Sequence, residues 1–222
     1  MLRVVLAWSG GKDSAWTLHL LRQRPDVEIA GLFTTVNEET GRIAVHEVRG
    51  ELLEAQARAT GLPLHVIPIP RPCPNLVYEQ ALGQFIARAR RAGVSHAAFG
   101  DLFLEDIRHY RERQFAGSGV ELLFPLWGLP TRALAEEMTA AGLRAWITCV
   151  DAKRAPAEWA GRVFDRAFVA AVPPGIDPCG ENGEFHTFVF EGPPLRGAVH
   201  AQPGAVTETD GTVRVDLLPP RI

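Results

Sequence analysis

The sequence predicts an α/β fold, with a doubly wound parallel sheet followed by a smaller mixed α/β C-terminal domain. Apolar runs of strand length alternate with amphipathic stretches through the first two-thirds of the 222 residues, which is typical of repeated β-α-β units. The first apolar run ends in Gly10-Gly11, directly before a helical stretch. The last third differs, because prolines and short apolar runs replace the alternation. In parallel sheets of this kind, ligands bind at the carboxyl ends of the strands, near the switch in strand order.

The strands of the first part are recognised as apolar runs of strand length, and the helices as amphipathic stretches between them. Strands are expected at Leu2–Trp8, Glu28–Thr35, Leu64–Ile69, His96–Gly100, Leu122–Phe124 and Ala145–Val150. Helices are expected between them, at Asp13–Arg24, Gly50–Thr60, Leu76–Ala92, Leu104–Ala116 and Arg132–Ala141.

The last third begins with the breakers Pro173-Pro174-Gly175 and Asp177-Pro178. Short strands are expected after them, at Phe185–Phe190, Gly197–His200 and Val213–Leu217, the last one preceded by an Asp210-Gly211 turn. We place the domain boundary in the segment Pro125 to Thr131, which gives domains of residues 1–126 and 127–222.

Composition is that of a globular protein, with 46% hydrophobic and 22% charged residues. No apolar run reaches the length of a membrane span, and the N-terminus lacks a signal-peptide layout. We therefore expect a cytoplasmic protein with no membrane partner. The net charge of −3 leaves no basic footprint, so no nucleic-acid partner is expected. A homodimer is left open.

Two sets of residues are interpreted structurally. The arginine clusters are read as solvated helix faces or partners of glutamate: Arg88, Arg90 and Arg91, then Arg108, Arg111 and Arg113. The three cysteines lack CxxC spacing, so neither a zinc site nor a disulfide framework is indicated: Cys73, Cys149 and Cys179.

The loop after the first strand carries the strongest chemical signal, Ser9-Gly10-Gly11-Lys12-Asp13-Ser14. Paired glycines before a helix leave backbone N–H groups facing an anion, and the helix dipole adds positive potential. Ser9 and Ser14 add hydroxyl donors, and Lys12 adds a point charge. Asp13 caps the helix or helps to hold a metal ion on the phosphates. The alternative is an ordinary strand–turn–helix corner, which also favours Gly, Ser and Asp.

The loop does not follow the Walker A spacing, because Lys12 comes directly after the glycine pair. It resembles instead the PP-loop of the N-type ATP pyrophosphatases, which grips the β- and γ-phosphates as a leaving group. That resemblance implies a Rossmann-like sheet of the adenine nucleotide alpha hydrolase type and cleavage of ATP to AMP and pyrophosphate. The chain has two lysines, Lys12 and Lys153. Arginine does not substitute freely for lysine beside a phosphate, so the lysine in the loop supports this interpretation.

A second concentration of titratable groups lies in residues 177–187, Asp-Pro-Cys-Gly-Glu-Asn-Gly-Glu-Phe-His-Thr. If the chain is extended here, Glu184 and His186 project to one face, and the glycines leave Glu181 free to fold toward the same point. A carboxylate beside a histidine is suited to acid–base work or to orienting a metal. A hairpin turn with solvated glutamates and a packed histidine is the structural alternative.

The run Gly-Glu-x-Gly-Glu-aromatic-His-Thr, together with the opening loop, resembles the diphthine–ammonia ligase family. Further matching stretches follow in the family's order between positions of about 9 and 190: Leu53-Glu54-Ala55-Gln56-Ala57, Gly61-Leu62-Pro63, Phe99-Gly100-Asp101, Asp106-Ile107-Arg108 and Pro125-Leu126-Trp127.

The resemblance implies a two-step ligation that uses ATP and Mg²⁺. A carboxylate attacks the α-phosphate, pyrophosphate leaves, and ammonia then displaces AMP to give an amide; the acceptor is a carboxylate, as in protein-bound diphthine. Ser9 through Ser14 would hold the phosphates, and Thr34 and Thr35 would approach the adenosine. Asp101 is a candidate for binding Mg²⁺, as Asp13 is, or for binding substrate. Alternatively, Asp101 is the N-cap of the helix that follows it. The implied catalytic set is Lys12, Asp13, Asp101, Glu181, Glu184 and His186.

Two other functions stay open at this stage. A PP-loop sulfurtransferase acting on RNA would use Cys179, but the cysteine pairs typical of such enzymes are lacking. A non-catalytic nucleotide-binding sensor would leave the Glu and His cluster unexplained. For the ligase, we expect a site between the two domains, in which the second domain supplies the acceptor contacts and Cys179 is dispensable.

Overall fold

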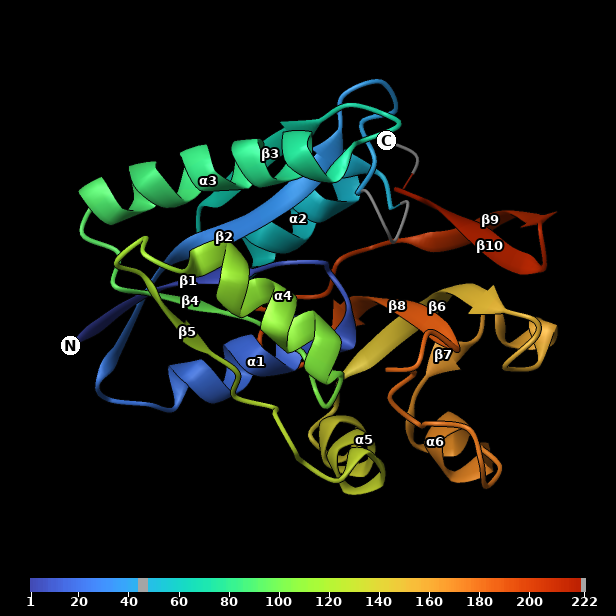
Figure 1. Ribbon diagram of the computed structural model, residues 1–222. Coiled ribbons are helices and arrows are strands. Elements are labelled where there is room, and N and C mark those ends of the chain that lie inside the picture. Colours follow the sequence, from blue (N-terminus) through green and yellow to red (C-terminus); the bar gives the residue numbers. More distant parts are fainter. Residues whose placement is uncertain (44–47, 221–222) are drawn as a thin grey trace.

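The computed structural model describes residues 1–43 and 48–220, and its first half is a five-stranded sheet. The strands run parallel in the order β3-β2-β1-β4-β5 (Figure 1). Their bounds are β1 Leu2–Ala7, β2 Val27–Asn37, β3 Leu64–Ile69, β4 His96–Ala98 and β5 Glu121–Leu123. Strands β2 and β3 thus extend the sheet on one side of β1, and β4 and β5 extend it on the other. The switch in strand order falls between β1 and β4.

Helices cover both faces of this sheet, as the doubly wound pattern predicts. Helices α1 (Lys12–Arg22) and α2 (Gly50–Thr60) pack with Leu6 on one face. Helices α3 (Asn75–Arg91) and α4 (Glu105–Phe115) pack with Val5 on the other. Val5 and Leu6 are adjacent in β1, so their opposite directions follow from the two-residue period of a strand.

The second half forms a separate antiparallel sheet around β6 (Arg144–Asp151). Strand β8 (Phe185–Glu191) pairs with one edge of β6, while β7 (Val163–Phe164) and β10 (Thr212–Leu218) share the other. The prediction that 145–150 continues the parallel sheet is therefore wrong. Strand β9 (Gln202–Thr209) completes the sheet beside β10, and α5 (Thr131–Ala140), η1 (Ala157–Trp159) and α6 (Arg166–Ala171) complete the elements.

Two predictions for the last third have different outcomes. The turn at Asp210-Gly211 is confirmed, with φ values of 53° and 78° that suit a two-residue hairpin. The strand expected at 197–200 is wrong, because these residues form an irregular strap in which the Val199 N–H donates to the Phe190 carbonyl over 2.7 Å. The strand lies just beyond it, at β9, where exposed polar residues, Pro203 and Gly204 hide the strand pattern.

The two sheets share one hydrophobic core. It runs from Leu6 of β1 and Trp16 of α1 through Phe185 and Val189 of β8 to Phe168 of α6. The expected boundary between residues 126 and 127 falls in the connection from β5 to α5 and stays a prediction. Within the described residues, no helix has the length and apolar character needed to cross a membrane.

Candidate functional site

The Ser9–Ser14 loop connects β1 to α1 at the switch in strand order, which is where parallel sheets bind ligands. Gly10 adopts a left-handed φ of 77°, and Gly11 is the N-cap of α1. The Gly11 N–H donates to Ser9 Oγ over 3.3 Å, and Ser14 Oγ donates to the Gly11 carbonyl over 2.9 Å. These contacts shape a compact turn at the positive end of the α1 dipole.

Strand β8 of the second sheet packs directly on this loop. The Val189 N–H donates to the Gly10 carbonyl over 2.9 Å, and the Lys12 N–H donates to Thr187 Oγ1 over 3.1 Å. A Cβ on Gly11 would lie 3.2 Å from the Thr187 carbonyl. The structure thus brings the loop into contact with Thr187, the last residue of the segment 177–187, and with Val189 beyond it. A shared site stays a prediction.

Lys12 points into the boundary between the two sheets. Its side chain is 3% exposed, and Nζ donates to Asp13 Oδ2 over 2.8 Å. Nζ also lies 5.6 Å from the centre of the Phe185 ring and 5.9 Å from that of Phe164, within cation–π range. Burial lowers the pKa of Lys12, but the charge of Asp13, with that of Glu181, outweighs it and raises the pKa overall. The ammonium therefore stays charged at neutral pH.

Glu181 is the carboxylate that the second part of the chain sends toward the loop. Its Oε1 accepts the Leu102 N–H over 2.8 Å, just after β4. Burial raises the pKa of Glu181 to about 7, and the nearby charges of Asp13 and Asp101 add to this. A carboxyl group that titrates near neutral pH is suited to accept and release protons.

Glu184 has a different environment from the one expected. Strand β8 begins at Phe185, directly after Glu184, whose backbone carbonyl still accepts from the Asp151 N–H of β6 over 3.0 Å. Its buried carboxylate turns back to its own loop, where Oε1 accepts from the Asp177 N–H over 3.2 Å and from Asn182 Nδ2 over 3.1 Å. These contacts brace the loop that presents Glu181.

His186 lies in β8, in register with Cys149 of β6, which is itself in register with Arg214 of β10. Burial lowers the pKa of His186 to about 4, helped by the charges of Lys12 and Arg214. The imidazole is therefore neutral at physiological pH, and it becomes protonated only at acidic pH.

Asp101 lies at the same edge of the sheet as the loop. Gly100 packs so closely on α1 that a Cβ there would lie 3.1 Å from the Asp13 carbonyl oxygen. The Asp101 carboxylate pairs with Arg111 Nε at 3.3 Å. Helix α4 begins at Glu105 with Leu104 as its N-cap, so Asp101 is not the cap. Its role toward substrate or Mg²⁺ stays a prediction.

Thr34 and Thr35 are consecutive in β2, beside β1. Successive side chains of a strand point to opposite faces. Thr34 is buried and Thr35 is partly exposed. The two threonines therefore cannot contact one adenosine from the same face of the sheet, and their contact with it stays a prediction.

The metal prediction concerns Asp13 and Asp101. Among residues 1–43 and 48–220, no three His, Cys, Asp or Glu side chains are grouped to hold a metal ion. Mg²⁺ commonly takes one or two carboxylates together with substrate phosphates and water. One carboxylate at the loop and one after β4 fit that mode.

Cys179 is buried, and its Sγ donates to the Thr131 carbonyl over 3.4 Å. Burial raises the pKa of its thiol well above the ordinary value, although Lys12 opposes the shift. The nucleophilic form of cysteine is the thiolate, so this environment favours a packing role.

Gln56 of α2 contacts the loop but was given no role from sequence. Its side chain is fully buried, and Nε2 donates to the Gly10 carbonyl over 2.9 Å. The available signal was a glutamine on the buried face of an amphipathic helix, beside Leu52 and Leu53.

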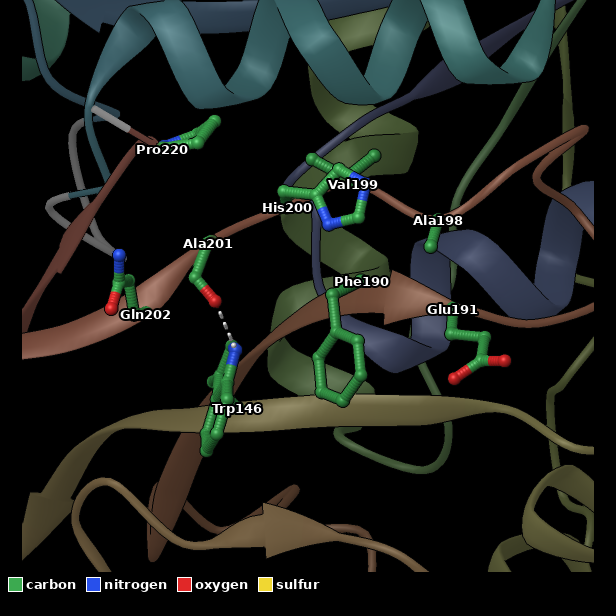
Figure 2. Close-up of a pocket in the computed structure, with 9 residues that line it drawn as sticks. All are labelled: Trp146, Phe190, Glu191, Ala198, Val199, His200, Ala201, Gln202 and Pro220. Atoms are coloured by element: carbon green, nitrogen blue, oxygen red, sulfur yellow. Dashed lines mark hydrogen bonds between the residues drawn. The ribbon is translucent and has the colours of Figure 1, made fainter. Parts of the chain in front are cut away.

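A cavity of about 430 Å³ lies elsewhere, between β6, β8 and the strap before β9 (Figure 2). Trp146 and Phe190 form its aromatic floor, with ring centroids 5.2 Å apart, and Trp146 Nε1 donates to the Ala201 carbonyl over 3.1 Å. None of its lining residues belongs to the predicted catalytic set.

Comparison with known families gives two matches. The model of the diphthamide synthase N-terminal domain matches residues 2–122, and that of the C-terminal domain matches residues 130–206. The chain belongs to the diphthamide synthase family, which confirms the resemblance drawn from the motifs. A search of curated proteins found no match to the chain.

Proposed function

We propose that this member of the diphthamide synthase family is an ATP-dependent, AMP-forming amide ligase. Its substrates are ATP, ammonia and a carboxylate acceptor, for which the family membership favours protein-bound diphthine. The observation that carries the proposal is the position of Glu181, which is hydrogen-bonded just after β4 and lies close enough to Lys12 and Asp13 of the Ser9–Ser14 loop to interact with their charges, at the switch point of the sheet. A phosphate-binding loop and a carboxyl group that titrates near pH 7 are what the two half-reactions need.

In the first step, an acceptor carboxylate oxygen attacks the α-phosphorus of ATP, and the bond to the β-phosphate oxygen breaks. Pyrophosphate leaves with that electron pair, and an acyl-adenylate remains. The charged Lys12 and the N-terminus of α1 stabilise the growing negative charge on the leaving group. Mg²⁺ held by Asp13 and Asp101 would neutralise phosphate charge.

In the second step, ammonia attacks the acyl carbon and AMP leaves with the electron pair of the C–O bond. The nitrogen must then lose a proton to give a neutral amide. Glu181 is the base that the structure favours for this transfer, because burial places its pKa at about 7 and Oε1 is fixed by Leu102. Glu184, the base expected from sequence, would act by bracing the Glu181 loop.

The test is product analysis with purified protein, ATP, Mg²⁺, ammonium and a panel of carboxylate acceptors. We expect pyrophosphate and AMP in equal amounts, together with amide. The two lysines provide a matched pair: Lys12→Met should abolish turnover, whereas Lys153→Met, at an exposed position, should not. ADP as the main nucleotide product would overturn the proposal. ATP binding without turnover would favour the sensor, and sulfur incorporation into RNA the sulfurtransferase.

A further inference from the structure

The Gln56 side chain is hydrogen-bonded to three residues from two separate segments of the chain. Its Nε2 donates to the Gly10 carbonyl in the loop and, over 2.6 Å, to the Val189 carbonyl in β8. Its Oε1 accepts from Trp8 Nε1 over 3.2 Å, one residue before the loop begins. Both amide hydrogens and the carbonyl oxygen of this fully buried side chain are thereby used.

These bonds hold the backbone conformation of the loop at Gly10. The Gly10 carbonyl also accepts from the Val189 N–H, so it is held between α2 and β8. A Cβ on Gly10 would lie 2.5 Å from Gln56 Oε1, which shows how closely the amide follows the left-handed turn. Because the Gly10 carbonyl and the Gly11 N–H belong to one planar peptide group, Gln56 controls where the Gly11 N–H points.

We propose that Gln56 is a positioning residue that sets the phosphate-binding conformation of the Ser9–Ser14 loop and couples it to the docking of β8. The inference rests on the proposed function, since it assigns the loop to phosphate. Gln56 itself does not contact the reacting atoms. It acts through the Gly10 carbonyl on one side and the Val189 carbonyl on the other.

The experiment compares Gln56→Met with wild type and with Gln114→Met. Methionine keeps the length of the side chain and removes all three hydrogen bonds. Gln114 is the matched control, because it lies in α4 and lines a cavity with α3 residues, on the opposite face of the sheet. The readouts are the dissociation constant for inorganic pyrophosphate by calorimetry, well below the melting temperature, and hydrogen exchange of the peptide covering residues 7–15.

We expect Gln56→Met to raise the pyrophosphate dissociation constant at least about tenfold and to speed exchange in residues 7–15. Gln114→Met should stay within about twofold of wild type. A variant that melts lower but binds pyrophosphate as wild type does would reduce Gln56 to a structural role and overturn the proposal. If Gln56→Met does not fold, the shorter Gln56→Asn takes its place, since it adds no charge and withdraws the amide from the Gly10 and Val189 carbonyls.

The same data separate this inference from the proposed function. If wild type itself fails to bind pyrophosphate, the assignment of the loop to phosphate fails, and the ligase proposal fails with it. Hydrogen exchange then decides the case of Gln56 alone. Faster exchange of residues 7–15 in Gln56→Met, with no change in Gln114→Met, supports the positioning role, and unchanged exchange overturns it.

Discussion

Gly10→Ala should destabilise the protein by far more than a glycine-to-alanine change usually does. The left-handed φ of 77° costs a residue with a Cβ about 1 to 2 kcal/mol. The new Cβ would also lie 2.5 Å from Gln56 Oε1, so the buried amide must move and give up hydrogen bonds worth about 0.5 to 1.5 kcal/mol each. Together these effects predict a loss of about 3 to 5 kcal/mol in the free energy of unfolding.

Two other glycines separate the contributions. Gly142 has a φ of 87° and open space around its Cβ position, so Gly142→Ala reports the backbone cost alone, about 1 to 2 kcal/mol. Gly83 lies inside α3 with open space and no positive φ, so Gly83→Ala should stabilise by about 0.5 to 1 kcal/mol. Urea unfolding of the three variants, compared at equal m-values, measures these differences. If Gly10→Ala costs no more than Gly142→Ala, the close contact between the loop and Gln56 is refuted.

Three further predictions concern the titratable groups of the site. The folded-state pKa of Glu181 is raised from 4.5 to about 7, so its ionisation opposes folding increasingly as pH rises between these values. Glu181→Gln should therefore leave the free energy of unfolding unchanged below about pH 4 and raise it by up to about 2 kcal/mol near pH 8. Equal effects at both pH values, measured by urea unfolding, would contradict this. Glu184→Gln should lower amide formation about 100-fold while ATP affinity stays within about 1 kcal/mol, because it weakens the contacts that brace the loop carrying Glu181, the proposed base. Product analysis and calorimetry measure the two effects, and an equal loss of both would show that the brace does not act on the acceptor step. Cys179→Ser should keep most activity. In the wild type, the Cys179 thiol should react with an alkylating reagent only after denaturation, whereas the partly exposed Cys73 should react in the native protein. Rapid labelling of Cys179 in the native protein, detected by mass spectrometry, would contradict its burial.

Local signals made the first half of the fold predictable. The strand Leu2–Ala7, the glycine turn and α1 are set by neighbouring residues, and α2 was predicted with the bounds that it has, ending at Thr60 and capped by Gly61 with a left-handed φ of 73°. The sheet to which β6 belongs was not predictable in this way. A buried strand has the same apolar pattern in either sheet, and its partners are decided by contacts far along the chain.

The site followed the same division. The loop and the Glu181 segment were found because their residues lie together in sequence. Gln56 was missed because its role arises only when α2, β8 and the loop meet. The contacts of Glu184 depend on where β8 begins, and strand ends are the least certain part of a sequence pattern.

The bond between Val189 and Gly10 has a consequence for how the molecule can be divided. A polypeptide stopping at residue 126 would expose the apolar face of α1 and α2 and would leave the Gly10 carbonyl without its partner from β8. The chain should therefore melt in a single cooperative transition, with neither half persisting alone. The same contact limits recombination between related proteins during evolution. A chimera that combines halves from two relatives must preserve the contacts of β8 with the loop as well as the fold of each half.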